Sequence, residues 1–158
     1  MKKLIAVAFV AGLVGFVAGN AFWYLASPLW IDNVVSESVT AADTAKVLAT
    51  GTFSDADAVH RGKGTATVYE GTGGQRTLRF TDFEVTNGPD LEVWLVAADT
   101  VTSNADVTGS EWVALGQLKG NIGDQNYDIP ADVDLSKYRS VVIWCEQFGV
   151  LFSPAALK

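Results

Sequence analysis

Few side chains in this sequence are suited to redox or metal chemistry. Among 158 residues there is one cysteine, Cys145, one histidine, His60, and one methionine, the initiator. A single cysteine forms no disulfide within the chain and provides neither a CxxC redox pair nor a CxxCH haem-attachment site. If Cys145 and His60 met in the fold, a thiolate and an imidazole would ligate haem iron from two sides or hold one metal ion.

Two interpretations of Cys145 remain open at this point. The residue shares strand parity with Val141 and Ile143, so it is buried if they face the core, and a buried cysteine is ordinarily a small inert hydrophobe. An unpaired thiol in an oxidising compartment is, however, a liability unless it is buried or used. The neighbouring Glu146 should raise the pKa of the thiol, which weakens the case for a bare nucleophilic thiol.

Other chemistries find less support. Blue copper needs two histidines as well as the cysteine, and structural zinc also needs more ligands, so no dedicated metal site is predicted. Asp55 and Asp57 lack the further ligands of an EF-hand loop, and His60 itself lies in a glycine-flanked loop or strand start. The segment Thr108–Trp112 lacks the second glycine of a nucleophile elbow. The sequence therefore gives little support to hydrolase chemistry.

The net charge of the chain makes some classes of binding partner less probable. The formal charge is −7, and because the first 26 residues contribute Lys2 and Lys3 and no acids, the remainder carries −9. Nucleic-acid phosphates are neutralised by clustered Lys and Arg, so nucleic acid is not an expected partner. A polybasic lipid-binding face is disfavoured for the same reason.

The N-terminal segment predicts a membrane helix. Leu4–Ala26 is apolar except for Asn20, and its 23 residues at about 1.5 Å each would span roughly 35 Å, enough for a hydrocarbon core of about 30 Å. The alternative is a signal peptide cleaved at Gly19–Ala21. In both interpretations the two lysines stay cytoplasmic and the rest is exported, which gives a single-pass membrane protein or, after cleavage, a secreted one.

Small residues recur on one face of this helix. Ala11, Gly15 and Gly19 follow one another at four-residue spacing, which would let another helix approach closely. Pairing with a second helix through this face is one expectation. The other is that glycine and alanine are simply common in such helices.

The exported part predicts an all-β domain. We expect a membrane anchor at 1–28, a partly helical stalk at 29–47, and a β-sandwich or barrel of short, mainly antiparallel strands at 48–158. The segments 65–69 and 76–80 are predicted to form a β-hairpin. A bulge is predicted near Asp82, because it would keep the apolar residues on both sides of it directed inward. Further strands are predicted at 91–96, 112–118, 127–129, 141–145 and 149–152, with a loop at 120–125 and at most one helical turn at 153–157.

The tryptophans are interpreted mainly as packing residues. By position, the five are core or membrane-edge residues. Trp94 and Trp144 fall on the strand faces opposite to those of their apolar neighbours. Trp144 would therefore border any pocket on the side of the strand away from Cys145.

Several motifs in order and in register resemble the DM13 domain family over about Leu48–Lys158. The first group is Phe53, His60, Gly62, Gly64, Phe83 and the run Asn87-Gly88-Pro89-Asp90-Leu91 with Val93 and Leu95. The second is Leu115-Gly116-Gln117-Leu118-Lys119-Gly120-Asn121, Gly123-Asp124-Gln125, Tyr127-Asp128-Ile129-Pro130, and Val141-Val142-Ile143-Trp144-Cys145 with Phe148, Val150 and Phe152.

The resemblance implies an electron-transfer domain of secreted and membrane proteins. Its implied redox centre is a cysteine that corresponds to Cys145, as a bare thiol or as a ligand to a prosthetic group such as haem. The first hypothesis is therefore a membrane-tethered extracytoplasmic redox module centred on Cys145, with His60 as a second ligand, that exchanges electrons with an unidentified protein. The second is a non-catalytic binding or structural module of the cell envelope in which Cys145 is buried and inert.

Overall fold

The computed structural model describes residues 2–27, 30–40 and 43–158. The chain divides into two compact units, one that ends at Ile31 and one that comprises Asp32–Lys158. They are described separately below.

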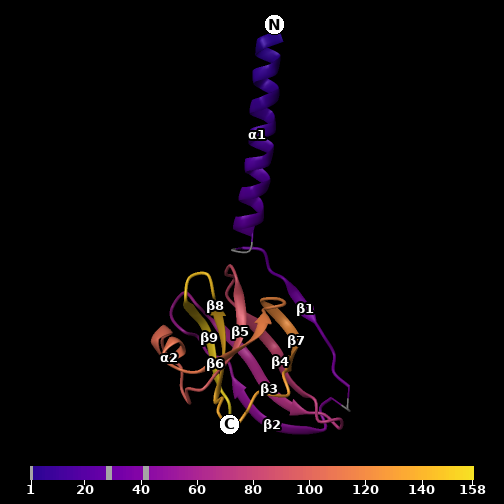
Figure 1. Ribbon diagram of the computed structural model, residues 1–158, viewed down its shortest axis with the longest axis vertical. Coiled ribbons are helices and arrows are strands. Elements are labelled where there is room, and N and C mark those ends of the chain that lie inside the picture. Colours follow the sequence, from indigo (N-terminus) through magenta and orange to yellow (C-terminus); the bar gives the residue numbers. More distant parts are fainter. Residues whose placement is uncertain (1, 28–29, 41–42) are drawn as a thin grey trace. The chain divides into compact units, whose positions relative to one another are not determined.

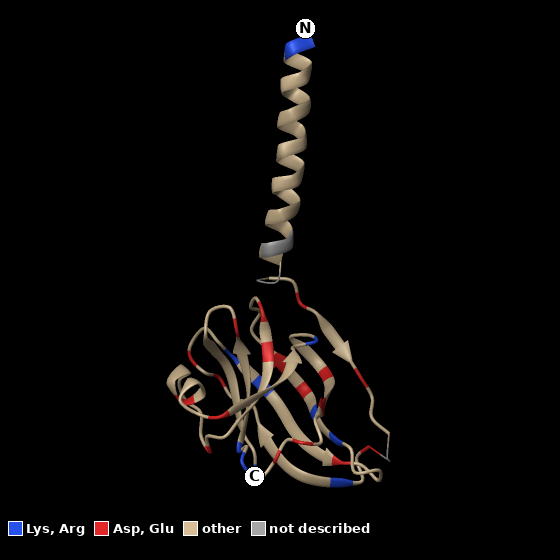
Figure 2. Ribbon diagram, in the orientation of Figure 1, with Lys and Arg blue, Asp and Glu red and all other residues tan. Residues whose placement is uncertain are grey.

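The first unit is built on one long helix, α1 (Lys2–Ala26). The large apolar side chains between Leu4 and Trp23 are exposed, and Figure 2 shows no acidic residue on this part of the helix and basic residues only at its start. Within the described residues, its Lys2–Trp23 portion is the one helical segment long and apolar enough to cross a membrane, a test that a signal sequence also passes. A side chain added at Gly15 or Gly19 would meet nothing within 4 Å, so this face is open, and helix pairing through it stays a prediction.

The second unit is a sandwich of two β-sheets (Figure 1). One sheet has the strand order β1-β7-β4-β3-β2 and the other β6-β5-β8-β9. Every hydrogen-bonded pair is antiparallel except β1 with β7. The strands are β1 Val34–Ser36, β2 Lys46–Thr52, β3 Gly62–Glu70, β4 Arg76–Val85, β5 Leu91–Val96, β6 Trp112–Gln117, β7 Ile122–Ile129, β8 Ser140–Cys145 and β9 Val150–Ala156. The predicted all-β sandwich behind an N-terminal apolar helix is confirmed.

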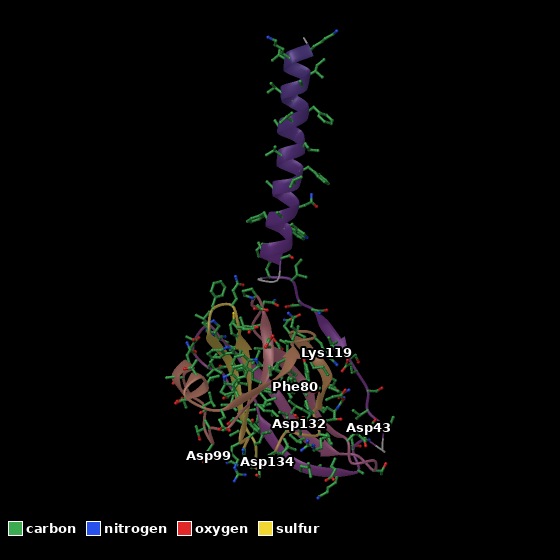
Figure 3. All side chains as sticks on the ribbon, in the orientation of Figure 1. Asp43, Phe80, Asp99, Lys119, Asp132 and Asp134 are labelled. Atoms are coloured by element: carbon green, nitrogen blue, oxygen red, sulfur yellow. The ribbon has the colours of Figure 1, made fainter. Side chains whose placement is uncertain are left out.

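The main core lies between the two sheets. Phe80, labelled in Figure 3, is fully buried there, and the Phe53 ring meets it edge-on with centroids 4.8 Å apart. At one edge of the sandwich, Thr50 and Lys158 exchange two backbone hydrogen bonds of 2.9 Å. The fold therefore joins β2 to the end of the chain at this edge.

The predicted bulge in β4 is confirmed. Asp82 has a positive φ of 51°, and the pairing of β4 with β7 shifts register between Phe80 and Glu84. The Asp82 N–H donates to the Asp124 carboxylate at 3.0 Å, which holds the extra residue in place. Because of this shift, Phe80 and Phe83 are both buried although their parities differ.

The helical interpretation of 29–47 is wrong for the described residues of that segment. It contains β1, which lies parallel to β7 in the first sheet, and the beginning of β2. Just before β1, the Asn33 N–H donates to the Asn121 side chain at 2.7 Å. A residue distant in sequence therefore fixes the start of β1. Residues 28–29 and 41–42 of the predicted segment lie outside the described residues.

Two predicted boundaries in the C-terminal half are also wrong. The expected loop at 120–125 becomes strand from Ile122, and the expected helical turn at 153–157 is mostly the continuation of β9 to Ala156. Pro154 is tolerated because β9 is an edge strand of its sheet, and its carbonyl accepts a hydrogen bond from the Ser54 N–H at 3.0 Å. A short helix that was not predicted, α2 (Asn104–Thr108), packs against β9.

Candidate functional site at Cys145

Cys145 is the last residue of β8, the most apolar strand of the sandwich. It is 1% exposed and belongs to the main core with Val141 and Ile143, as strand parity predicted. Its Sγ–H donates to the Pro89 carbonyl at 3.1 Å. The turn that contains Pro89 is held to the end of β8 by a hydrogen bond of 3.0 Å from the Glu146 N–H to the Asp90 carbonyl. This turn covers the thiol.

The surroundings keep the Cys145 thiol protonated. Burial is the largest cause that raises its pKa, and the Asp90 carboxylate raises it further, against opposing hydrogen bonds from the Phe148 and Gln147 N–H groups. The upward direction was predicted, but the carboxylate responsible is that of Asp90 rather than Glu146. A thiol with a raised pKa is a poor nucleophile and a poor metal ligand, because both roles need the thiolate.

A group of carboxylates lies beyond the thiol on the outer side of the second sheet. The charge of Glu92 is the largest cause that raises the pKa of Glu146, followed by desolvation and by the charge of Asp90. Glu92 in turn accepts a hydrogen bond of 2.7 Å from the indole N–H of Trp94. The rim of the site is therefore acidic and carries one carboxylate bound to an aromatic ring.

His60 is held by a local acidic partner. Its Nδ1 lies 2.7 Å from Asp57 Oδ2, and its ring packs on Phe152 with centroids 4.3 Å apart. The His60 side chain is the largest cause that lowers the pKa of Asp57 to about 2, followed by the N–H groups of His60 and Val59. Since Asp57 is ionised, Nδ1 is the donor in this contact, and Nε2 is left as the nitrogen that is able to bind a ligand.

His60 and the turn that binds Cys145 both lie next to Phe152. The Phe152 ring packs against His60, and a Cβ built on Gly88 would come within 2.5 Å of the same ring. Gly88 precedes Pro89, whose carbonyl binds Cys145. No hydrogen bond or ring contact joins the two predicted ligands directly within the described part of the chain.

The pair does not fit haem or a metal ion as it is arranged here. The sulfur is buried and bonded to a backbone carbonyl, whereas the His60 ring is bonded to Asp57 and packs on Phe152. In residues 2–27, 30–40 and 43–158, no group of three or more His, Cys, Asp or Glu side chains is placed to hold a metal ion. We therefore derive no step through such a group, and ligation by Cys145 and His60 stays a prediction.

Sequence reasoning missed a stack of three tryptophans near Cys145. Trp112 and Trp94 are parallel, with centroids 4.0 Å apart and planes 11° apart, and Trp94 lies 5.5 Å from Trp144. The parity of Trp94 and Trp144 indicated that both leave the main core. Their contact was not predictable, since it depends on the pairing of β5 with β6 and β8, which the sequence pattern does not reveal.

Fold and site together define a two-sheet β domain with a single buried thiol beside aromatic residues. Residues 52–157 match the family described as electron transfer DM13. Because the match covers most of the chain, including His60, Cys145 and the three tryptophans of the stack, the protein belongs to this family. Comparison with curated proteins and with solved structures finds no match.

Proposed function

We propose that this protein is an electron-transfer module in which the Cys145 thiol is the redox group. The observation that carries the proposal is the family match over residues 52–157, within which the only cysteine of the chain ends a core strand. Its neighbour Trp144 contributes to a stack of aromatic rings. Membership of an electron-transfer family and the presence of a single cysteine support the same assignment.

The thiol environment favours one-electron chemistry over thiol–disulfide exchange. Exchange needs a thiolate that reaches a disulfide, whereas Cys145 is buried and its pKa is raised. In the proposed step, Cys145 gives one electron to a one-electron acceptor on a partner protein and its Sγ proton to the Asp90 carboxylate, whose charge acts on the thiol. The acceptor is reduced by one electron, and a one-electron donor together with a proton later restores the thiol.

The proposal places this domain at the outer face of a membrane. The α1 helix is long and apolar enough to span a bilayer, and Lys2 and Lys3 at its start favour a cytoplasmic N-terminus. The β domain would then be extracytoplasmic and tethered. Cleavage after Ala21 would instead release it as a secreted domain.

A second candidate function is a non-catalytic binding or structural module. The observation that favours it is the burial of Cys145 together with its hydrogen bond to the Pro89 carbonyl, which is also how an inert core cysteine is accommodated. In this case the thiol would take no part in electron exchange.

A redox titration of the full chain in detergent separates the two candidates. The titration would compare the wild type with Cys145→Ala and with the matched control Ser140→Ala. Ser140 is also a small buried residue of β8, and its side chain also donates to a backbone carbonyl, that of Ala98 at 2.8 Å. We expect the wild type and the control to release one more electron than Cys145→Ala.

Equal electron counts in all three proteins would refute the redox role of Cys145 and favour the binding module. An absorption spectrum and metal analysis of the same samples test the ligand version of the hypothesis. A Soret band or bound metal that is lost both in Cys145→Ala and in His60→Ala would establish ligation by this pair. His60→Ala should leave the circular dichroism of the fold unchanged, because the His60 side chain contacts only Asp57 and Phe152 in the interactions described above.

A further inference from the structure

The outer face of the second sheet carries an aromatic path from the surface toward Cys145. Trp112 on β6 is 46% exposed, whereas Trp94 on β5 and Trp144 on β8 are 5% and 3% exposed. The first two rings are stacked at 4.0 Å, and the second and third are 5.5 Å apart. Trp144 directly precedes Cys145. The path therefore begins at a ring that solvent reaches and ends at the residue that precedes the buried thiol, on the opposite face of β8.

The sheet places these rings in sequence. Trp112 lies opposite Val96 and Trp94 opposite Val142, so each tryptophan is the diagonal neighbour of the next across a strand pair. Diagonal positions on one sheet face are within reach of large aromatic side chains. Buried apolar side chains surround the Trp94 and Trp144 rings in a second core next to α2. These side chains are Val96, Val101, Val107, Val142 and Leu151. Water is therefore kept away from the two inner rings.

The middle ring has a proton acceptor. The indole N–H of Trp94 donates to the Glu92 carboxylate at 2.7 Å. Removal of an electron from an indole makes its N–H strongly acidic, and a carboxylate already bonded to that proton is placed to receive it. A packing role alone would not require a carboxylate at this position, since a backbone carbonyl or water would satisfy the indole N–H equally well.

We propose that Trp112, Trp94 and Trp144 form a one-electron relay between the protein surface and Cys145, with Glu92 as the proton acceptor of Trp94. The inference rests on the proposed function, because Cys145 is the electron donor at the inner end of the relay. The external reactant is a one-electron oxidant that meets the protein over the exposed Trp112 ring.

Each step of the relay conserves electrons and protons. The oxidant takes one electron from Trp112 and is reduced by one electron. Trp94 then restores Trp112 with one electron and passes its N–H proton to Glu92, and Trp144 next gives an electron to Trp94, which recovers that proton. Finally Cys145 gives an electron to Trp144 and its Sγ proton to the Asp90 carboxylate, whose charge acts on the thiol. The net reaction is the one-electron oxidation of the thiol by an oxidant that never contacts it.

Flash photolysis of the full chain in uncharged detergent micelles tests the relay. The oxidant is a photo-oxidised ruthenium polypyridyl complex, and the background is Trp23→Phe/Trp30→Phe, so that Trp112 is the exposed tryptophan that remains. Transient absorption distinguishes the cationic from the neutral indole radical. We expect Trp112→Phe to lose the radical signal, because the two other rings are covered, and Trp94→Phe to leave the radical on Trp112.

Glu92→Gln and Glu146→Gln form a matched pair for the proton step. The two carboxylates are neighbours, but it is Glu92 that binds the Trp94 indole. Glu92→Gln should slow the conversion of the cationic radical to the neutral one, and Glu146→Gln should not. An unchanged conversion in Glu92→Gln would overturn the role of Glu92. An unchanged radical yield in Trp112→Phe, or a radical on Trp112 that decays as fast in Trp94→Phe as in the background protein, would overturn the relay.

Cys145→Ala separates failure of the relay from failure of the proposed function. The variant should prolong the Trp144 radical, because its electron donor is missing. An unchanged lifetime while the tryptophan variants behave as expected would refute Cys145 as the donor and leave the relay in place. Conversely, a relay that fails while the titration still shows oxidation of Cys145 would refute the relay alone.

Discussion

At the scale of single residues, the two predicted ligands are fixed by different physical means. Cys145 is held by packing and by one hydrogen bond to the Pro89 carbonyl, whereas His60 is held by the Asp57 carboxylate on an exposed loop. Burial raises the pKa of the thiol, and hydrogen bonding lowers the pKa of the carboxyl. The same sequence therefore contains one group stabilised as neutral and one stabilised as charged.

Asp57 provides a pH prediction. Its pKa is lowered from the usual 3.8 to about 2, first by the His60 side chain and then by the N–H groups of His60 and Val59. Because the pKa is lower in the folded state, the contribution of Asp57 to stability is fully present above pH 3.8 and is lost as the pH falls toward 2. Carboxyl-carbon NMR should show the Asp57 pKa rise in His60→Ala. A pKa that stays near 2 in the variant would mean that the N–H donors suffice.

Gln125 provides a stability prediction. The side chain is fully buried, its amide donates to the Gly120 carbonyl at 2.9 Å, and its oxygen accepts the Tyr127 hydroxyl at 2.7 Å. Gln125→Ala removes the donor to the Gly120 carbonyl and the acceptor of the Tyr127 hydroxyl proton, although the Lys119 N–H still donates to that hydroxyl at 3.0 Å. The substitution also opens a cavity, so the free energy of unfolding should fall by about 3 kcal/mol. The exposed Gln117→Ala is the control and should change stability by less than about 0.5 kcal/mol in a urea titration. Equal losses in the two variants would contradict the role of the buried network.

At the scale of elements, sequence reasoning succeeded where one strand face is apolar. The hairpin of β3 and β4, the bulge at Asp82 and the inward direction of Cys145 were all predicted from the period-two pattern, and the structure confirms them. That pattern is strong because a shift by one residue would move a whole apolar face into water. Local information was sufficient for these features.

The wrong predictions concern elements that are stabilised by residues distant in sequence. β1 has three residues and is held to β7 by pairing across almost ninety positions of sequence, and the polar start of β7 depends on the buried Gln125 rather than on an apolar face. Neither β1 nor the start of β7 has the alternation that marks a half-buried strand, whereas Tyr127–Ile129 at the end of β7 has it and was predicted as a strand. The contact of Trp94 with Trp112 and Trp144 was missed for the same reason, since strand order is not a local property.

The junction of β1 and β7 supplies a prediction at this scale. Gly123 has a positive φ of 101°, and a Cβ built on it would collide with the Val35 carbonyl oxygen. Gly123→Ala should therefore detach β1 from β7. Gly116→Ala is the matched control, because Gly116 has a φ of 116° but nothing within 4 Å of the built Cβ, so it carries the conformational cost of about 1–2 kcal/mol without the collision.

Amide hydrogen exchange would measure the difference between Gly123→Ala and Gly116→Ala. The backbone bonds that join β1 to β7 should lose protection in Gly123→Ala, including the Glu37 N–H, which donates to the Asp124 carbonyl at 2.9 Å. The amides of β5 and β8 should stay protected in both variants. Loss of protection at β1 in Gly116→Ala as well would show that backbone strain, rather than the collision, releases the strand.

At the scale of the whole molecule, charge and hydropathy divide the chain into two chemically different parts. The described residues of α1 beyond its first turn carry no charged side chain, whereas the remainder of the chain has a formal charge of −9 (Figure 2). A protein that combines such parts is stable where the helix meets lipid and the acidic domain meets water. The net negative charge of this remainder also disfavours binding to anionic lipid headgroups as a second means of membrane attachment.

The state of α1 is therefore the prediction on which the location of the protein depends. If α1 is a retained anchor, the full chain should stay in the membrane fraction after washing with alkaline carbonate, and N-terminal sequencing should find the residues that precede Leu4. Leu13→Arg places a charge near the centre of the helix, at a cost of about 2.5–3.5 kcal/mol, and should reduce insertion. Asn20→Ala is the control, since it removes a polar side chain and should not weaken insertion.

A soluble chain that begins at Phe22 would contradict retention and establish cleavage after Ala21. In that case Ala21→Leu should restore the membrane-bound form, because signal cleavage requires a small residue at that position. The two outcomes carry different consequences for electron transfer. A retained α1 confines Cys145 and Trp112 to encounters with partners at the membrane surface, whereas a released domain must find its one-electron partner by diffusion in three dimensions.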